Sequence, residues 1–322
     1  MIPYYSLAPR TLALLASVSE RIGEVHAAHL HHPPPWLRRA HRVSVIHATL
    51  ALEDNALDPA NIARLLDGPA PASPGPAELE ALNTIRLYNL LSRLNPFLGQ
   101  DLRLAHGELM HGLAMDPGHY RTGDLEVRYG GRPAGRKAMG RNLSSQTEQL
   151  LHYTENDEGP LLITGCVLHF GLASIRPFTA GNGRIARLWH KLLLLRQWPV
   201  FAYLPLEGFI QRGREGYYAA LELADRREDC GAFIAYMLER IDEALHELLM
   251  RERPVLNAPR RMADFLLGRD RPAFSRKDYR RTYPELSAAT ASRDLAQATA
   301  DGRLLRTGTG RNARYRPATT ND

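Results

Sequence analysis

The sequence predicts a mainly helical protein: a helical bundle that carries a small β-hairpin, followed by a C-terminal winged helix-turn-helix. Along most of the 322 residues, hydrophobic side chains recur at spacings of three and four, and few segments alternate as strands do. After residues 253–259, which contain two prolines, short capped helices and two short strands follow. With 44% hydrophobic and 24% charged residues, the composition suits a soluble globular chain of more than one domain.

Proline-rich loops and helices alternate in the first part of the chain. The loops are expected at 31–36 and 68–76, and the helices at 38–57, 58–68 and 78–113. In the shorter helix, Asp58 is a typical N-cap, Pro59 occupies the first position and Gly68 closes the end.

Residues 123–132 (GDLEVRYGGR) are the best candidate for β structure in the bundle. Leu125, Val127 and Tyr129 alternate with charged residues, and Gly130-Gly131 supplies a tight turn. A hairpin is therefore expected to project from the helices, within residues 123–140.

The most informative segment is IRPFTAGNGRIARLWHKLLLL, residues 175–195. It joins a helix that is apolar nearly all round to a second packed helix, and Gly181 and Gly183 let the loop between them turn sharply. The second helix directs unpaired N–H groups from its N-terminus, which makes a ready anion site. Arg184 and Arg187 stand on this first turn, where the helix dipole disfavours cations unless phosphate oxygens compensate them. The alternative is a glycine turn between core helices with solvated arginines.

The last part of the chain, residues 253–322, is predicted to form the winged helix. Ser275 and Ser287 are typical N-caps of its second and third helices, and two short strands flank the glycine-rich turn GTGRN. Residues 259–322 hold 14 lysines and arginines against 7 aspartates and glutamates, a net charge of +7. This excess favours DNA as a partner, although a solvated basic face explains the charge equally well. The candidate DNA-binding residues are Thr290, Ser292, Arg293, Arg311 and Arg314.

The loop segment RPFTAGNGRIAR resembles the signature of the Fic (Fido) family, HPFxDGNGRxxR, whose active members transfer AMP from ATP to a protein hydroxyl. HATLALEDN is similar to the inhibitory-helix motif of that family, and HYRTGDLEV with GGR is similar to the approach to its hairpin flap. The resemblance extends through FAYLPLEGFIQRGREGYYAAL and FIAYMLERIDEAL, and the bacterial subfamily concerned often ends in a winged helix. It implies a Fic-type bundle with three parts: residues 1–95 with the inhibitory helix (38–57), a core at 96–252 with the flap (123–140) and signature loop (176–187), and the winged helix at 253–322.

The resemblance also implies roles for the loop residues. Asn182 would position an α-phosphate, and the backbone amides of Gly181–Arg184 would form an anion hole. Arg184 would meet the β-phosphate and Arg187 the γ-phosphate, while Phe178 would fill the core beneath the loop. His169 matches a histidine seven residues before the motif, and a hydrogen-bonded histidine within a helix is the expectation there.

The departures from the signature bear on activity. Arg176 occupies the position of the histidine that acts as general base, and a guanidinium stays protonated and cannot accept the proton. Ala180 replaces the acidic residue that holds magnesium and has no ligand atom. We therefore expect ATP or another adenine nucleotide as a ligand, no magnesium site and no ordinary AMP transfer.

Thr49 and Glu53 stand four residues apart on the predicted helix 38–57 and match the inhibitory motif. The resemblance implies that Glu53 pairs with Arg187 and excludes a γ-phosphate. The alternative is an exposed glutamate on the last helical turn. Asp54 stands where the motif has glycine or asparagine, so the helix end is expected to differ in geometry.

Three functions are compatible with the sequence. The chain is a degenerate Fic protein that acts by binding a nucleotide or phosphate, an active transferase with unconventional chemistry, or a DNA-binding regulator whose Fic body forms a homodimer or senses a ligand. A target protein at the flap is compatible with the first two. With two distant cysteines, no apolar stretch long enough to span a membrane and no signal-peptide pattern, a cytoplasmic location is the default expectation.

Overall fold

The chain divides into two units, Met1–Arg251 and Glu252–Asp322. The computed structural model describes residues 2–28, 30, 35–252, 258–267, 273–283, 286–308, 310 and 313–318. In this part of the chain, no helix combines the length and the apolar character needed to cross a membrane.

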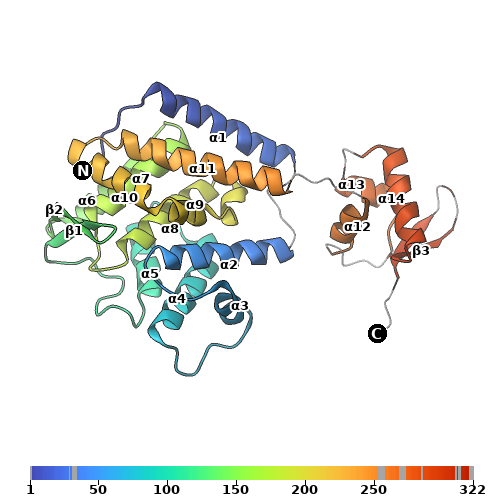
Figure 1. The fold of residues 1–322 in the computed structure, drawn as a ribbon, viewed down its shortest axis with the longest axis horizontal. Coiled ribbons are helices and arrows are strands. Elements are labelled where there is room, and N and C mark those ends of the chain that lie inside the picture. The colour runs from blue at the N-terminus through green and yellow to red at the C-terminus, as the bar shows by residue number, and fades with distance from the viewer. Residues whose placement is uncertain are drawn as a thin grey trace. The chain divides into compact units, whose positions relative to one another are not determined.

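The first unit is a bundle of helices (Figure 1). Its elements in order are α1 (Pro9–Ala27), α2 (Pro35–Ala51), α3 (Pro59–Asp67), α4 (Pro76–Leu90), η1 (Leu91–Arg93), α5 (Gly99–Leu109), β1 (Leu125–Tyr129), β2 (Arg132–Ala138), α6 (Leu143–Asn156), α7 (Leu161–Ile175), α8 (Asn182–Leu195), η2 (Pro199–Ala202), α9 (Leu206–Arg212), α10 (Arg214–Arg227) and α11 (Gly231–Glu252). Figure 1 shows α1 along α11 on one side of α8, and α2 to α5 on the other.

Helices α7 and α8 form the centre of this unit. Nearly every residue of α7 is buried, which agrees with its apolar sequence, and α8 buries Ile185, Trp189 and Leu193 among others. The two helices pack against each other, so the short loop between them is held at both ends by the core. The position of this loop is therefore fixed by the packing of the bundle.

The end of α2 differs from the prediction. The helix spans Pro35–Ala51, so the predicted span 38–57 is wrong at both ends, and its start falls within the predicted loop 31–36. Asp54 adopts a left-handed conformation with φ 63°. The Asn55 amide donates to the Leu50 carbonyl at 3.1 Å and the Asp54 amide to the Ala51 carbonyl at 3.2 Å, which is the Schellman arrangement. An aspartate thus occupies the place that glycine usually takes at a helix end, and it turns residues 52–55 away from the helix axis.

Local signals elsewhere in the first unit hold as predicted. The Asp58 carboxylate caps α3, with Pro59 at the first position and Gly68 after the last. Strands β1 and β2 pair antiparallel, and the turn residues Gly130 and Gly131 have φ of 57° and 80°. Both values lie in the left-handed region that a two-residue hairpin turn requires.

The second unit has its own core of aromatic and aliphatic side chains. Its elements are α12 (Ala258–Leu267), α13 (Arg276–Thr282), α14 (Ala288–Ala300), β3 (Leu304–Thr307) and β4 (Arg314–Pro317). Ser275 and Ser287 cap α13 and α14, and β3 pairs antiparallel with β4. The predicted mainly helical fold, with a hairpin in the bundle and a small hairpin near the C-terminus, is confirmed.

Candidate functional site

A cleft with a volume of about 490 Å³ lies at the N-terminal end of α8. Four segments line it: the loop before α8, the turn after α2, the hairpin and α10. Their cleft-lining residues are Thr179–Gly183 with Ala173, Arg176 and Arg187, then Leu52–Asp54, then Leu125, Glu126 and Arg128–Gly131, and finally Arg214, Tyr217, Tyr218 and Leu221.

The Asn182 side chain holds the loop before α8 in shape. The Asn182 side-chain oxygen accepts from the Phe178 amide at 3.0 Å, and its amide nitrogen donates to the Phe178 carbonyl at 2.8 Å. Gly181 has φ 72°, and a Cβ there would approach the Met110 sulfur to 2.8 Å. The positive φ and close packing of Gly181 and the two bonds of Asn182 therefore set the shape of the loop.

Phe178 is fully buried beneath the loop, as the resemblance implies. Its ring stacks on His106 with centroids 3.7 Å apart. Because His106 accepts from the Gly118 amide at Nδ1, its Nε2–H donates to the Ala180 carbonyl at 3.1 Å. Burial lowers the pKa of His106 to about 4, so the ring is neutral at physiological pH. Sequence reasoning missed His106, which lies far from the loop in the chain.

The first turn of α8 presents backbone N–H groups to the cleft. No side chain caps this helix, and its first turn contains no acidic residue. The first intrahelical bond runs from the Ile185 amide to the Gly181 carbonyl, and Asn182 and Gly183 line the cleft. Uncapped amides and the positive end of the helix dipole together favour an anion at this point.

Arg176 is a cleft arginine held by neutral groups. It closes α7 with φ 48°, donates from Nη2 to the Arg128 carbonyl and lies 5.7 Å from the Tyr129 ring centroid. Its buried Nε has no hydrogen-bond partner within the described chain, and burial lowers its pKa. The other cleft arginines, Arg128, Arg187 and Arg214, each contact a carboxylate. Arg176 therefore brings a positive charge that no carboxylate of the cleft balances.

Glu53 and Arg187 form the ion pair that the resemblance implies. The Arg187 Nη2 lies 2.7 Å from the Glu53 Oε1, and the two side chains are 3% and 30% exposed. Burial alone would raise the pKa of Glu53, but the charges of Arg187 and Arg184 lower it below its ordinary value. Thr49 is buried one turn earlier on α2 and does not line the cleft.

Asp54 makes a second ion pair across the cleft. Its two carboxylate oxygens lie 2.6 Å and 3.1 Å from the Nη1 and Nη2 of Arg214, and the Arg214 guanidinium lies 5.8 Å from the Tyr218 ring centroid. Sequence reasoning flagged Asp54 as a departure but missed Arg214, Tyr217 and Tyr218. These residues belong to α10, and only the packing of α10 beside the hairpin places them here.

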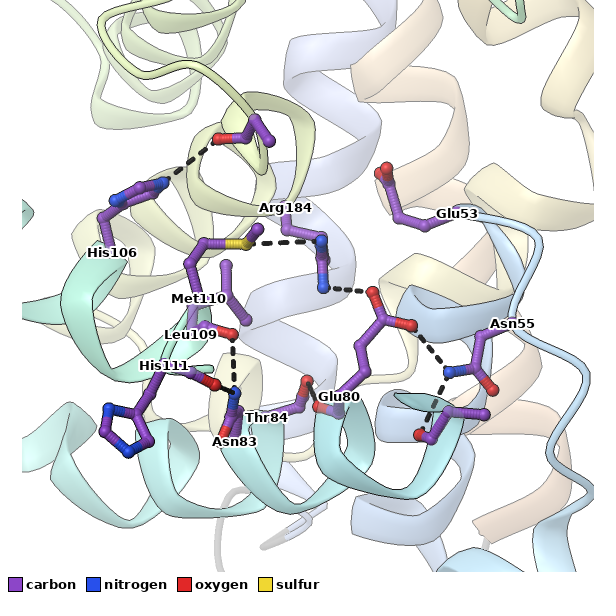
Figure 2. A network of polar contacts seen from close by, with 12 residues as sticks. Glu53, Asn55, Glu80, Asn83, Thr84, His106, Leu109, Met110, His111 and Arg184 are labelled. Atoms are coloured by element: carbon purple, nitrogen blue, oxygen red, sulfur yellow. Dashed lines mark hydrogen bonds and ion pairs between the residues drawn. The ribbon is translucent and has the colours of Figure 1, made fainter. Parts of the chain in front are cut away.

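Arg184 does not line the cleft in this structure. Figure 2 shows its guanidinium between Glu80 and the sulfur of Met110, which lies 3.5 Å from Nη2. Glu80 in turn accepts from Asn55 at 2.6 Å. The side chain thus ties α8 to α4 and, through Glu80, to the turn after α2.

His169 is a hydrogen-bonded helix histidine, in line with the expectation. It is fully buried, with Nε2 2.9 Å from the Tyr217 hydroxyl and Nδ1 3.3 Å from Nδ1 of His190. Burial holds its pKa well below the ordinary value, so the ring is neutral and braces Tyr217 behind the cleft.

The carboxylates of the cleft do not fit a magnesium site. Position 180 is alanine, and the lining carboxylates Glu53, Asp54 and Glu126 are each bound to an arginine. Magnesium needs free oxygen ligands in near-octahedral geometry. Nowhere in the described segments do three His, Cys, Asp or Glu side chains gather as metal ligands would.

Two of the predicted DNA-binding residues are exposed on the second unit. Arg293 on α14 and Arg314 on β4 are exposed, while Thr290 and Ser292 are half-buried near the start of α14. The Ser292 hydroxyl accepts from Arg276 and donates to the Ala288 carbonyl, both at 2.9 Å. Arg311 lies outside the described residues.

Comparisons with known proteins agree on one family. Residues 96–194 match the model of the Fic/DOC family. The protein adenylyltransferase fic-1 of Caenorhabditis elegans is 32% identical over 98 residues, which is 29% of this chain and 18% of that protein. A Fic family protein from Desulfovibrio desulfuricans G20 superposes with a TM-score of 0.73 at 28% identity, over 99% of each chain. A Fic domain containing signaling protein from Bacteroides thetaiotaomicron shares the fold at 14% identity, with a TM-score of 0.54 over 70% of this chain and 95% of that one.

Proposed function

We propose that this chain, whose residues 96–194 match the Fic/DOC family model, binds an adenine nucleotide or a related phosphate in its cleft and acts through this binding. The family typically binds ATP, and the C. elegans relative is a protein adenylyltransferase. AMP transfer itself is not part of the proposal, because this chain departs from the family signature at the two positions that serve the chemistry.

The observation that carries the proposal is the combination of uncapped α8 amides with the unbalanced charge of Arg176. Both face one cleft, and both are satisfied by the same kind of ligand group, a phosphate. An arginine at this point offers further N–H donors to an anion and compensates charge without a metal. The structure thus supports phosphate binding that does not depend on magnesium.

The same arginine argues against AMP transfer. A general base must accept a proton from the attacking hydroxyl, and a guanidinium does not. The Arg176 guanidinium also donates a hydrogen bond to the backbone carbonyl of Arg128 on β1. In this proposal, Glu53 is the inhibitory residue that keeps Arg187 from a third phosphate, and Thr49 packs the helix that carries it.

We expect the purified protein to bind ADP in the presence of EDTA, and the Arg176→Met variant to bind it about tenfold more weakly. The loss corresponds to one charge-assisted contact to phosphate. Isothermal titration calorimetry with ADP, with and without magnesium, makes the measurement. Arg86→Met is the matched control, because Arg86 is exposed on α4 and does not line the cleft.

Two outcomes would contradict this proposal. Binding that disappears with EDTA would mean that a metal is required after all. Robust transfer of radiolabelled AMP to itself or to lysate proteins would instead show an active transferase.

DNA binding by the second unit is a second candidate function. The observation that favours it is the set of exposed basic side chains on α13, α14 and the wing: Arg276, Lys277, Arg280, Arg281, Arg293, Arg306, Arg314 and Arg316. The Asp294 carboxylate at the inner face of α14 is buried and bound to Arg261 at 2.7 Å. The Asp294 carboxylate therefore faces the core, while the neighbouring Arg293 presents a positive charge on the exposed face of α14.

We expect Arg314→Ala to weaken DNA binding about equally for all sequences and to reduce the salt slope by about one, as loss of a phosphate contact does. Arg293→Ala should instead reduce discrimination between sites by about tenfold, because it removes a contact to a base edge. Mobility-shift titrations at several salt concentrations, with DNA upstream of the gene and with scrambled DNA, measure both. Arg226→Ala, an exposed change in the first unit, is the control. No shift at low salt would assign the winged helix to protein contacts.

A further inference from the structure

The turn after α2 carries three consecutive polar residues, and each binds a different helix. Glu53 contacts Arg187 of α8, Asp54 contacts Arg214 of α10, and Asn55 contacts Glu80 of α4. The Asn55 contact lies behind the turn, in the network of Figure 2, and fixes its position. The carboxylates of Glu53 and Asp54 both line the cleft.

The Asp54 contact is built differently from the Glu53 contact. The Asp54 side chain is 76% exposed and that of Arg214 is 34% exposed, whereas Arg187 is 3% exposed. Asp54 can therefore leave Arg214 without breaking any buried packing, and water solvates the carboxylate that is released. An exposed pair of this kind contributes little to stability, so the contact is easily exchanged.

Arg214 is well placed to take an anion in exchange. It lines the cleft, lies over the ring of Tyr218, and presents both terminal nitrogens to the two oxygens of Asp54. This two-point geometry is the one by which arginine binds a phosphate. Tyr218 is itself confined by the hairpin, since a Cβ on Gly130 would approach its ring to 2.8 Å. The guanidinium therefore has a fixed platform beneath it.

We propose that Arg214 is a further ligand-binding residue of the cleft, held by Asp54 in the free protein and transferred to an anionic group of the ligand on binding. This inference rests on the proposed nucleotide function. Two cleft arginines, Arg187 and Arg214, are matched by two carboxylates of one turn. The terminal phosphate of a nucleoside diphosphate replaces the Asp54 carboxylate at Arg214, while the Glu53 carboxylate stays on Arg187 until a third phosphate is present. Arg214 thus supplies the cationic contact that Arg184, bound to Glu80 outside the cleft, does not.

A double-mutant cycle tests this inference by calorimetry with ADP in EDTA. Asp54→Asn removes the charge and keeps a residue that tolerates the left-handed conformation. It should tighten ADP binding about threefold. Arg214→Met should weaken ADP binding about tenfold. In the Arg214→Met background, Asp54→Asn should leave ADP affinity unchanged, because Asp54 affects the ligand only by competing for Arg214. Asp67→Asn is the matched control. It also removes an exposed carboxylate that is paired with an arginine, Arg39, but Asp67 does not line the cleft, so ADP binding should be unchanged.

The outcomes separate this inference from the proposed function. If the wild-type protein binds ADP but Arg214→Met binds it equally well, Arg214 is not a ligand residue and the inference fails alone. An equal gain from Asp54→Asn in both backgrounds would likewise sink it, since the effect would then be general charge. If neither the wild type nor Glu53→Gln binds ADP, the proposed function fails and the inference falls with it. Arg214→Lys, which keeps the charge, should recover part of the affinity and so excludes misfolding as the cause.

Discussion

The Glu53→Gln variant is expected to bind ATP about thirtyfold more tightly than the wild-type protein, a gain of about 2 kcal/mol. In the wild type, a third phosphate must displace the Glu53 carboxylate from an Arg187 side chain that is only 3% exposed. Water cannot compensate so buried a guanidinium, so ligand and carboxylate compete for it directly. Glutamine keeps the size of the side chain and removes the competing charge. Calorimetry with ATP and ADP in EDTA measures the change, which should be smaller for ADP.

A matched control is available within the same cleft. Glu126→Gln also removes one negative charge from the lining, but its partner Arg128 is 53% exposed and belongs to the hairpin. We expect this variant to change ATP affinity by less than about threefold. An equal gain from both variants would show that Glu53 acts through the general field of the cleft and not through Arg187.

Replacement of Glu207 by glutamine is expected to lower the free energy of unfolding of the first unit by about 3–5 kcal/mol. The Lys191 and Glu207 side chains are 1% and 3% exposed, with Nζ and Oε2 2.8 Å apart. Tyr88 donates to the other carboxylate oxygen at 3.1 Å. Glutamine would leave the ammonium of Lys191 charged, buried and without its counter-ion. Urea unfolding followed by tryptophan fluorescence reports this unit specifically, because Trp36, Trp189 and Trp198 all belong to it.

Two further variants make the cause of this loss identifiable. Glu222→Gln removes a half-exposed partner of the exposed Arg226 and should change stability by less than about 0.5 kcal/mol. The double variant Lys191→Met with Glu207→Leu removes both buried charges and should recover most of the stability. A double variant as unstable as Glu207→Gln alone would mean that packing, and not the unpaired charge, is responsible.

The features that the sequence predicted correctly are those that depend on neighbouring residues. Asp58 and Ser287 cap helices through bonds to amides three positions away, and Gly130-Gly131 closes a turn between adjacent strands. Each is a local rule that no distant contact overrides here. The Glu53–Arg187 pair links distant residues, and it was accessible only because a family resemblance aligned both positions at once.

The features that the sequence did not reveal depend on how distant helices pack. Glu80 and Arg184 are 104 residues apart, and Asp54 and Arg214 are 160 apart, so no spacing rule connects them. The end of α2 was missed for a different reason. The hydrophobic period continues past Ala51, and an aspartate in the left-handed conformation gives a weaker stop signal than glycine.

The closed loop before α8 has a consequence for the thermodynamics of recognition. Because the Asn182 amide already bonds to both backbone groups of Phe178, the amides of the anion site are preorganised before a ligand arrives. Little backbone entropy remains to be lost there on association, which is where loop-based sites usually weaken. Ligand affinity at this end of the cleft should therefore depend on desolvation and charge. Making the loop still more rigid should not increase it. A loop variant such as Asn182→Ala would convert a rigid receptor into one that has to fold around its ligand.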